Sequence, residues 1–328
     1  MARATDDPRE AVCWAIAYLE LARRLRSRPL VTAPRRVVPG ASYLVSRRCT
    51  QREFLLKPSS LTNLILKFVL AVAAARHGIL VHAICVMSNH LHIVLTDPDA
   101  RLPDFSRFFD GVVAKALNAL HGRWENCWAP SSYSAVCLVS PEDLIEKVAY
   151  TLANPATADL VEHGRQWPGV WSDPRSIGGP GEVVVRPGHY FSKDGTMPEV
   201  AELVFSAPPG FQSAEEFRSR VIARVNELEQ AAAEKREENC TAVLGARRVL
   251  KQKHTDRPAP GEARRVLDPR IAAKDKWKRI EALQTLATFL KSHREALVRF
   301  CSGERDVVFP HGTYLMRVRF GVAACATG

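Results

Sequence analysis

The chain of 328 residues lacks several patterns that would assign a class directly. None of its eight cysteines forms a C-x-x-C pair, which excludes a zinc ribbon and a thioredoxin-like motif. Scattered cysteines suit a reducing compartment, where they act as small buried apolar residues.

No stretch approaches the roughly 20 uncharged apolar residues needed to span a bilayer. Acidic residues such as Asp6, Asp7 and Glu10 precede the apolar part of the N-terminus, and Glu20 interrupts it, unlike a signal peptide. We therefore expect a cytoplasmic protein with no membrane partner.

The chain is strongly basic, with a formal net charge of +11 and a pI of about 9.5. A surplus of positive charge of this size suits a polyanionic partner. Nucleic acid is the first candidate and an acidic membrane surface the second. A basic surface that is simply solvated would also explain the charge. Between Gly245 and Arg299, fifteen Lys or Arg residues stand against six Asp or Glu. Most of the surplus is therefore near the C-terminus.

The length of 328 residues predicts two folded units. Residues 8–27 have helical periodicity and predict an N-terminal helical extension over 1–33. Residues 34–178 carry the clearest pattern of elements and form the main domain. From 179 to 328 we expect a basic, mostly helical region that serves as an accessory DNA-binding part. Within it we predict helices at 213–238 and 275–300 and a closing strand at 312–322.

Alternation, capping residues and helix breakers define the elements of the main domain. The last helix must end before Pro155, because a proline disfavours helical geometry in the residue before it. The order β-α-β-β-α-β-α predicts an α+β fold of ferredoxin-like or RRM-like type, with helices packed on a central antiparallel sheet. The expected strands are 41–48, 79–88, 91–96 and 132–139, and the expected helices are 61–77, 104–124 and 142–153.

The most informative stretch is ICVMSNHLHIVL, residues 84–95. In an extended segment, alternation places His90 and His92 on one face and Leu91 on the other. Two adjacent imidazoles make half of a metal site. Taken alone, the pair would more often be ordinary sheet residues, so the prediction depends on finding further ligands.

Tyr150 and Asn154 stand four residues apart on the last predicted helix and share one of its faces. Asn154 offers an amide oxygen, which is an acceptable ligand for a hard cation. Tyr150 offers a phenolic hydroxyl, which is a possible nucleophile. Each residue alone has a simpler interpretation, as a packed aromatic ring and as a helix-terminal residue.

The two segments VMSNHLH (86–92) and YTLANP (150–155) combine M-x-N-H-x-H with Y-x-x-x-N-P. This combination resembles the single-tyrosine HUH transposases, in particular the REP-associated tyrosine transposases and the insertion-sequence-200-like enzymes. The similarity covers about 35–175, and the element order matches the family's core. Ser88 stands where the family often has Pro, and Asn154 stands where better-known members have Gln.

The resemblance implies a metal-dependent transposase or endonuclease for single-stranded, hairpin-forming DNA. His90, His92 and Asn154 would hold Mg²⁺ or Mn²⁺ against the scissile phosphate. Tyr150 would attack the phosphorus, leaving a 5′-phosphotyrosine and a free 3′-hydroxyl, and a second 3′-hydroxyl could reverse the linkage without ATP. The sequence leaves open whether Tyr150 serves its own histidines or those of a second copy in a homodimer.

Single-stranded DNA also needs phosphate contacts and stacking surfaces. Basic residues follow the first predicted strand and recur over 247–279, which could hold a hairpin or a flanking duplex. Trp124 and Trp128 could stack on bases, with packing as the simpler alternative. The candidate DNA-binding residues are Arg47, Arg48, Arg52, Arg247, Arg248 and Lys251.

Two other functions fit parts of the pattern. A domesticated relative could bind structured DNA or RNA without cutting it, but such a descendant has no physical need to keep His90, His92, Tyr150 and Asn154 together. A relaxase or replication initiator of the same chemistry ranks lower, because many of those enzymes use a third histidine where this chain has an amide.

Overall fold

The computed structural model describes residues 33–130, 133–188, 190–192, 194–259 and 270–326. The helix expected at 8–27 lies outside these residues. The chain divides into two compact units. We call Pro39–Arg279 the core unit, and the described parts of Met1–Val38 and Ile280–Gly328 the terminal unit. The domain boundaries expected near residues 34 and 179 stay predictions. Each described helix is too short or too polar to cross a membrane.

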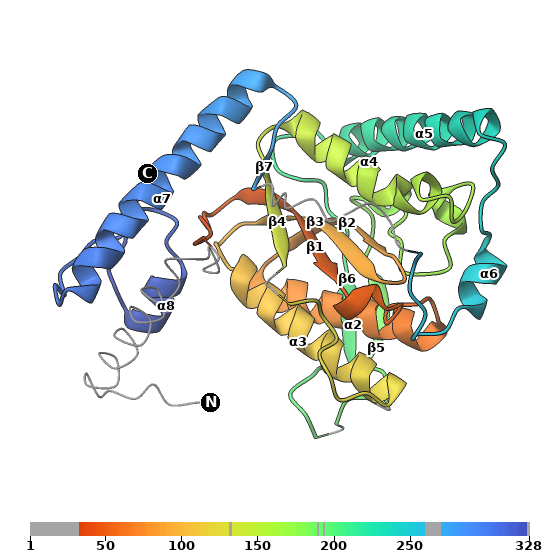
Figure 1. The fold of residues 1–328 in the computed structure, drawn as a ribbon, viewed down its shortest axis with the longest axis horizontal. Helices are drawn as coiled ribbons and strands as arrows, with labels where there is room; N and C mark the ends of the chain where they lie inside the picture. The colour runs from red at the N-terminus through yellow and green to blue at the C-terminus, as the bar shows by residue number, and fades with distance from the viewer. Residues whose placement is uncertain (1–32, 131–132, 189, 193, 260–269, 327–328) are drawn as a thin grey trace. The chain divides into compact units, whose positions relative to one another are not determined.

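A five-stranded sheet forms the centre of the core unit (Figure 1). Its strand order is β2-β3-β1-β4-β7; the first four strands are antiparallel to their neighbours, and β7 runs parallel to β4. The predicted α+β class with a mainly antiparallel sheet is confirmed. The two-residue β7 was not predicted, because so short a strand has no readable alternation. The strands are β1 (Ala41–Arg48), β2 (Leu80–Val86), β3 (His90–Asp97), β4 (Ser134–Leu138) and β7 (Ile271–Ala272).

Three helices accompany these strands, and local sequence explains where they begin and end. The Ser59 hydroxyl accepts a hydrogen bond from the Thr62 N–H at 3.1 Å at the start of the first helix. Gly78 ends that helix in a left-handed conformation, with φ of 65°. Ser140 and Asp143 form a capping box at the start of the third helix. The helices are α2 (Ser60–His77), α3 (Leu102–His121) and α4 (Pro141–Thr157).

The predicted end of α4 before Pro155 is wrong, because the helix continues to Thr157. A proline removes one backbone donor and so costs the helix one hydrogen bond. Here Pro155 lies in the last turn, and the Ala158 N–H still donates to the Asn154 carbonyl at 3.0 Å. Asn154 therefore lies inside the helix, which fixes its direction relative to Tyr150.

The remaining elements of the core unit follow α4 along the chain. The strands β5 and β6 pair with each other in a second, two-stranded sheet. The long helix predicted at 213–238 is confirmed as α5, and it packs against α4. These elements are β5 (Glu182–Val185), β6 (Val200–Leu203), α5 (Ala214–Glu238), α6 (Ala246–Lys251) and the 3-10 helices η1 (Thr50–Arg52), η2 (Gly164–Gln166) and η3 (Pro174–Ser176).

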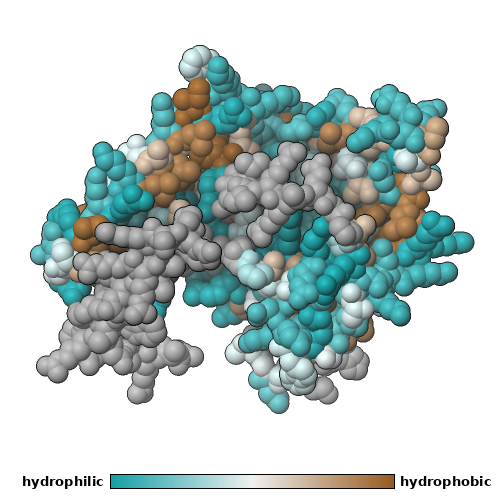
Figure 2. Space-filling model, viewed as in Figure 1, coloured by the Kyte–Doolittle hydropathy of each residue, from teal (hydrophilic) through white to brown (hydrophobic). Residues whose placement is uncertain are grey.

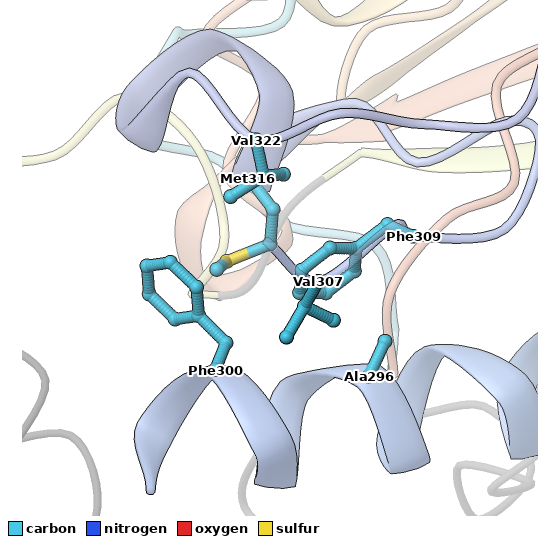
Figure 3. Packing of buried hydrophobic residues seen from close by; sticks show 6 residues of the cluster. All are labelled: Ala296, Phe300, Val307, Phe309, Met316 and Val322. Atoms are coloured by element: carbon cyan, nitrogen blue, oxygen red, sulfur yellow. The ribbon is translucent and has the colours of Figure 1, made fainter. Parts of the chain in front are cut away.

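The terminal unit is built around α7 (Lys276–Cys301) and α8 (Leu315–Phe320). The N-terminal side of the chain joins it where the Val37 N–H donates to the Gly312 carbonyl at 2.9 Å. Figure 3 shows side chains from α7, from the segment between α7 and α8, from α8 and from the segment after it pointing toward one another. This cluster consists of Ala296, Phe300, Val307, Phe309, Met316 and Val322.

The predicted strand at 312–322 is wrong, because most of that segment forms α8. Its apolar residues alternate, but they also contain the four-residue spacing of a helix. Met316 and Phe320 both pack into the cluster of the terminal unit, whereas Val318 between them is 57% exposed. The segment therefore forms a helix, because packing of residues four apart outweighs the alternating pattern of a strand.

Hydrophobic residues are exposed along α7, as Figure 2 shows on the face in view. Trp277, Leu283 and Val298 are between 48% and 74% exposed. Single exposed apolar residues are common on protein surfaces and need no special explanation. We assign no role to them.

Candidate active site

His90 and His92 lie at the start of β3, which pairs with β2 and β1 inside the sheet. Their ring centroids are 5.0 Å apart. Leu91 between them is buried at 1% exposure. The register places Arg48 of β1 opposite His90 and Ser46 opposite His92. The side-by-side placement predicted from alternation is therefore present.

Tyr150 reaches the same face of the sheet from α4. Its ring lies edge-on to the imidazole of His92, with centroids 5.6 Å apart and planes inclined by 71°. The side chain is 41% exposed, so a substrate can reach the hydroxyl. The Lys147 ammonium lies 5.5 Å from the centroid of the Tyr150 ring, one helical turn earlier on α4. The structure thus brings a phenol and two imidazoles of one chain together.

Asn154 follows Tyr150 by four residues on α4 and lies one turn further along the same helix face. Its side chain is buried, at 8% exposure. The helix packs against α5, β2 and β3, and Tyr150 on the same face as Asn154 contacts His92.

Each histidine is held through its Nδ1 atom. The Nδ1 of His90 donates to Asn89 Oδ1 at 2.7 Å, which leaves Nε2 with a free lone pair. The Nδ1 of His92 lies 2.7 Å from Ser46 Oγ, and the tautomer that donates to this hydroxyl also leaves Nε2 free. A hydrogen bond on one ring nitrogen that orients the other is typical of metal-binding histidines.

Burial, together with the charges of Arg48 and Arg52, lowers the pKa of His90 to about 4. Burial also lowers the pKa of His92 to about 3, assisted by His90 and then by Arg48. Both rings are therefore neutral near pH 7, which is the form that binds a cation.

The donor chemistry fits a divalent cation. Two neutral imidazoles with oriented Nε2 atoms and a buried amide are acceptable ligands, although hard cations favour carboxylates. Within the described ranges, no three His, Cys, Asp or Glu side chains are grouped so as to hold a metal ion. His90, His92 and Asn154 include an amide and form a different kind of set, in which a substrate oxygen would have to complete the shell.

The two arginines that end β1 point to opposite faces of the sheet. Arg48 stands opposite His90 and is exposed. Arg47 stands opposite Leu91, and its Nε lies 3.2 Å from Asp110 Oδ2 on α3. The structure therefore brings Arg48, and not Arg47, to the face of the histidines.

Arg52 reaches the site by a different route, in the short helix η1. Its carbonyl accepts a hydrogen bond from Asn89 Nδ2 at 3.4 Å, and its side chain is exposed. Gln51 and Arg52 have φ of 47° and 63°. Two successive non-glycine residues in this left-handed region cost about 1 kcal/mol or more each and are typical of functional loops.

The two candidate stacking residues differ in exposure. Trp128 is 8% exposed, and its indole N–H donates to the Asp110 carbonyl at 2.8 Å, so it packs. Trp124 is 95% exposed on the loop after α3. That loop joins η1, because the Thr50 N–H donates to the Cys127 carbonyl at 2.9 Å.

Sequence reasoning missed three residues that contact the site: Ser46, Asn89 and Lys147. Asn89 belongs to the M-x-N-H-x-H segment and could have been identified there. Lys147 precedes Tyr150 by three residues, which is a readable helical spacing. Ser46 required the register between β1 and β3. The remaining candidates, Arg247, Arg248 and Lys251, lie on α6.

Comparison with known proteins gives limited similarity. No protein-family model matches the chain, and no curated protein matches its sequence. Among solved structures, it is similar to a REP-associated tyrosine transposase bound to a REP hairpin, with 18% identity, a TM-score of 0.38 and coverage of 45% of this chain and 85% of that one. It is also similar to a Deinococcus radiodurans R1 protein provisionally described as a transposase, with 22% identity, a TM-score of 0.26 and coverage of 32% and 85%.

Proposed function

We propose that the protein cleaves and rejoins single-stranded, hairpin-forming DNA with Tyr150 as its nucleophile, as an enzyme of the HUH transposase type. The observation that carries the proposal is the contact between the Tyr150 and His92 rings. It unites the two sequence segments on which the family resemblance rests. The element order β-α-β-β-α-β-α and the antiparallel order β2-β3-β1-β4 support the same proposal.

The proposed reaction is a phosphoryl transfer. The Tyr150 hydroxyl gives up its proton, and its oxygen forms a bond to the phosphorus. The bond from phosphorus to O3′ breaks, and O3′ leaves with the electron pair and takes up a proton. The products are a 5′-phosphotyrosine and a 3′-hydroxyl, and attack by another 3′-hydroxyl restores a DNA strand and the free phenol.

The residues around Tyr150 prepare it for this step. His92 and Lys147 contact its ring, so they limit the directions in which the hydroxyl can point. Arg48 and Arg52 are exposed cations beside His90 and suit phosphates of the bound strand. The exposed ring of Trp124 suits an unpaired base.

We propose Mg²⁺ or Mn²⁺ as the cofactor, with His90, His92 and Asn154 as its protein ligands. When bound, the cation would supply Lewis-acid stabilisation of charge on the scissile phosphate. Since this ligand set has no carboxylate, Mn²⁺ should bind more tightly than Mg²⁺.

The experiment is a covalent-adduct assay. Full-length protein is incubated with a panel of hairpin oligonucleotides and Mn²⁺, and adducts are separated on a denaturing gel. We expect an adduct with the wild type and none with Tyr150→Phe, which keeps the ring contact with His92. Tyr133→Phe is the matched control, because it removes a phenolic hydroxyl in the same unit and should retain the adduct.

Two outcomes would change the conclusion. If Tyr150→Phe forms the adduct as the wild type does, another residue is the nucleophile. If the wild type binds hairpins without forming an adduct under any metal, the protein is a structured-nucleic-acid-binding protein instead.

A further inference from the structure

The segment Leu244–Arg257, which we call the strap, is fastened to the core unit at both ends. At its start, the N–H groups of Leu244 and Gly245 donate to the carbonyls of Asp159 and Leu160, at 2.8 and 2.9 Å. These carbonyls follow directly after α4, the helix of the proposed nucleophile. The strap therefore begins beside the C-terminal end of the helix that carries Tyr150 and Asn154.

The middle of the strap is held by α6, which lies at the right-hand edge of the core unit in Figure 1. Val249 of α6 is fully buried in a cluster with Met87, Val161 and Trp167. Because Met87 lies in the turn between β2 and β3, just before the histidine segment, α6 is packed on the turn that leads into the site.

The far end of the strap is fastened beside η1. The Phe54 N–H donates to the Asp256 carbonyl at 2.9 Å. Arg257 pairs with Glu53 at 2.6 Å, and Glu53 also pairs with Arg123 at 3.0 Å. Glu53 is only 8% exposed, so these two ion pairs form a partly buried clasp.

A series of contacts connects this far end of the strap to the proposed metal ligand His90. The clasp residue Glu53 directly follows η1. The Arg52 carbonyl of η1 accepts from Asn89 Nδ2, and Asn89 Oδ1 accepts from His90 Nδ1. The strap thus runs from the end of α4, past the β2–β3 turn, to the loop that supports His90.

The outward residues of the strap are mainly basic. Arg247, Arg248, Lys251 and Lys253 are all exposed, while Val249 faces inward. Residues 245–257 include no Phe, Trp or Tyr. A single-strand groove requires aromatic rings on which bases stack, whereas a duplex backbone requires only cations. This composition favours a duplex over a single strand.

We propose that the strap binds the phosphate backbone of a double-stranded DNA stem, and so positions the adjoining single strand at Tyr150. The proposal deepens the proposed function and rests on it for the identity of the single strand. The exposed Trp124, next to Arg123 of the clasp, would receive an unpaired base. The strap would therefore discriminate a hairpin from an unstructured strand without reading base sequence.

The test is hairpin binding by the full-length protein in EDTA, where no cleavage can occur, over a range of salt concentrations. The variant replaces Arg247, Arg248 and Lys251 by Ala. We expect its hairpin affinity to fall about tenfold or more, and the slope of log K against log salt to decrease by roughly 2 to 3. Binding of an unstructured oligonucleotide should change less than about twofold.

The control variant replaces Arg76, Arg107 and Lys115 by Ala, since these are exposed cations on α2 and α3, outside the strap and outside the basic C-terminal region. It removes the same charge and should keep the wild-type affinity. The proposal is overturned if the strap variant binds the hairpin as the wild type does, if both probes lose equal affinity, or if the control loses as much. If the strap variant loses hairpin affinity but the wild type forms no adduct in the cleavage assay, the cleavage function is rejected and the duplex-binding role of the strap is retained. If the wild type forms an adduct but the strap variant binds the hairpin normally, the cleavage function is retained and the role of the strap is rejected.

Discussion

The edge of the Tyr150 ring lies against the imidazole of His92, with the two centroids 5.6 Å apart. His92 is in turn held by Ser46, whose Oγ is 2.7 Å from its Nδ1. A hydroxyl on β1 therefore influences a phenol on α4 through a single imidazole between them. This chain of contacts makes the site sensitive to residues that would not touch the substrate.

We expect Ser46→Ala to lower the rate of adduct formation by about 10- to 100-fold, because His92 loses the hydrogen bond that selects its tautomer and orients its ring. The rate is measured with a hairpin substrate and Mn²⁺. Ser134→Ala is the control, since Ser134 stands opposite Ser46 on the other neighbouring strand. Equal rates for Ser46→Ala and the wild type would show that the hydrogen bond has no role.

The role of Asn154 can be tested by metal binding alone. Asn154→Ala should weaken Mn²⁺ binding by about tenfold or more, and Asn154→Asp should strengthen it, because a carboxylate is the better ligand for a hard cation. Free Mn²⁺ is measured by electron paramagnetic resonance without DNA. Asn226→Asp makes the same charge change at an exposed position of α5 and should not alter the affinity. An unchanged dissociation constant in both Asn154 variants would remove it from the ligand set.

Stability should depend on pH through His82, which lies away from the site and is fully buried. Its Nδ1 lies 2.6 Å from the Ser206 carbonyl, and its Nε2 lies 2.8 Å from the Thr96 hydroxyl. Burial lowers the pKa of His82 to about 4, although the bond to Ser206 opposes this shift. The unfolded chain has a pKa near 6.5 and binds the proton first.

The free energy of unfolding should therefore fall as the pH drops from about 6.5 to about 4, with up to about 3 kcal/mol arising from His82. The full contribution is present above pH 6.5. Urea unfolding across this range is compared between the wild type and His82→Gln. The variant should be less stable at pH 7 and should show a smaller loss on acidification. Identical slopes in the two proteins would contradict the prediction.

We expect Glu53→Gln to lower the free energy of unfolding by about 1–3 kcal/mol, because two arginines lose a partly buried counter-charge. Urea or thermal unfolding measures the change. Glu125→Gln, at an exposed position of the loop after α3, should stay within about 0.5 kcal/mol of the wild type. The same value for both variants would show that the clasp contributes no stability.

Several elements were predictable because their causes are local. Ser140, Pro141 and Asp143 define the start of α4 through contacts within one turn. Gly78 ends α2 because it adopts a left-handed conformation without strain. The alternation of His90, Leu91 and His92 required only that the segment be extended.

The wrong predictions came from places where local preference was overruled. Pro155 disfavours a helix, but its position in the last turn of α4 made the cost small. The residues of α8 alternate like a strand, but Met316 and Phe320 gain more by packing together into one cluster. For α8 the deciding term was packing against residues distant in the sequence, whereas for α4 it was the position of the proline within the helix.

The sequence by itself determined which chemical groups the site contains and that His90 and His92 share a face, because periodicity depends only on the backbone. Only the tertiary structure decided that Tyr150 meets His92, that Ser46 holds that imidazole, and that Arg47 pairs with Asp110 on the opposite face. The position of the strap was also decided by the tertiary structure. Its composition shows that the segment is basic but does not show which part of the core unit it contacts. The reason is physical: strand register and helix docking arise from packing between segments far apart in the chain, and single-residue preferences do not encode them.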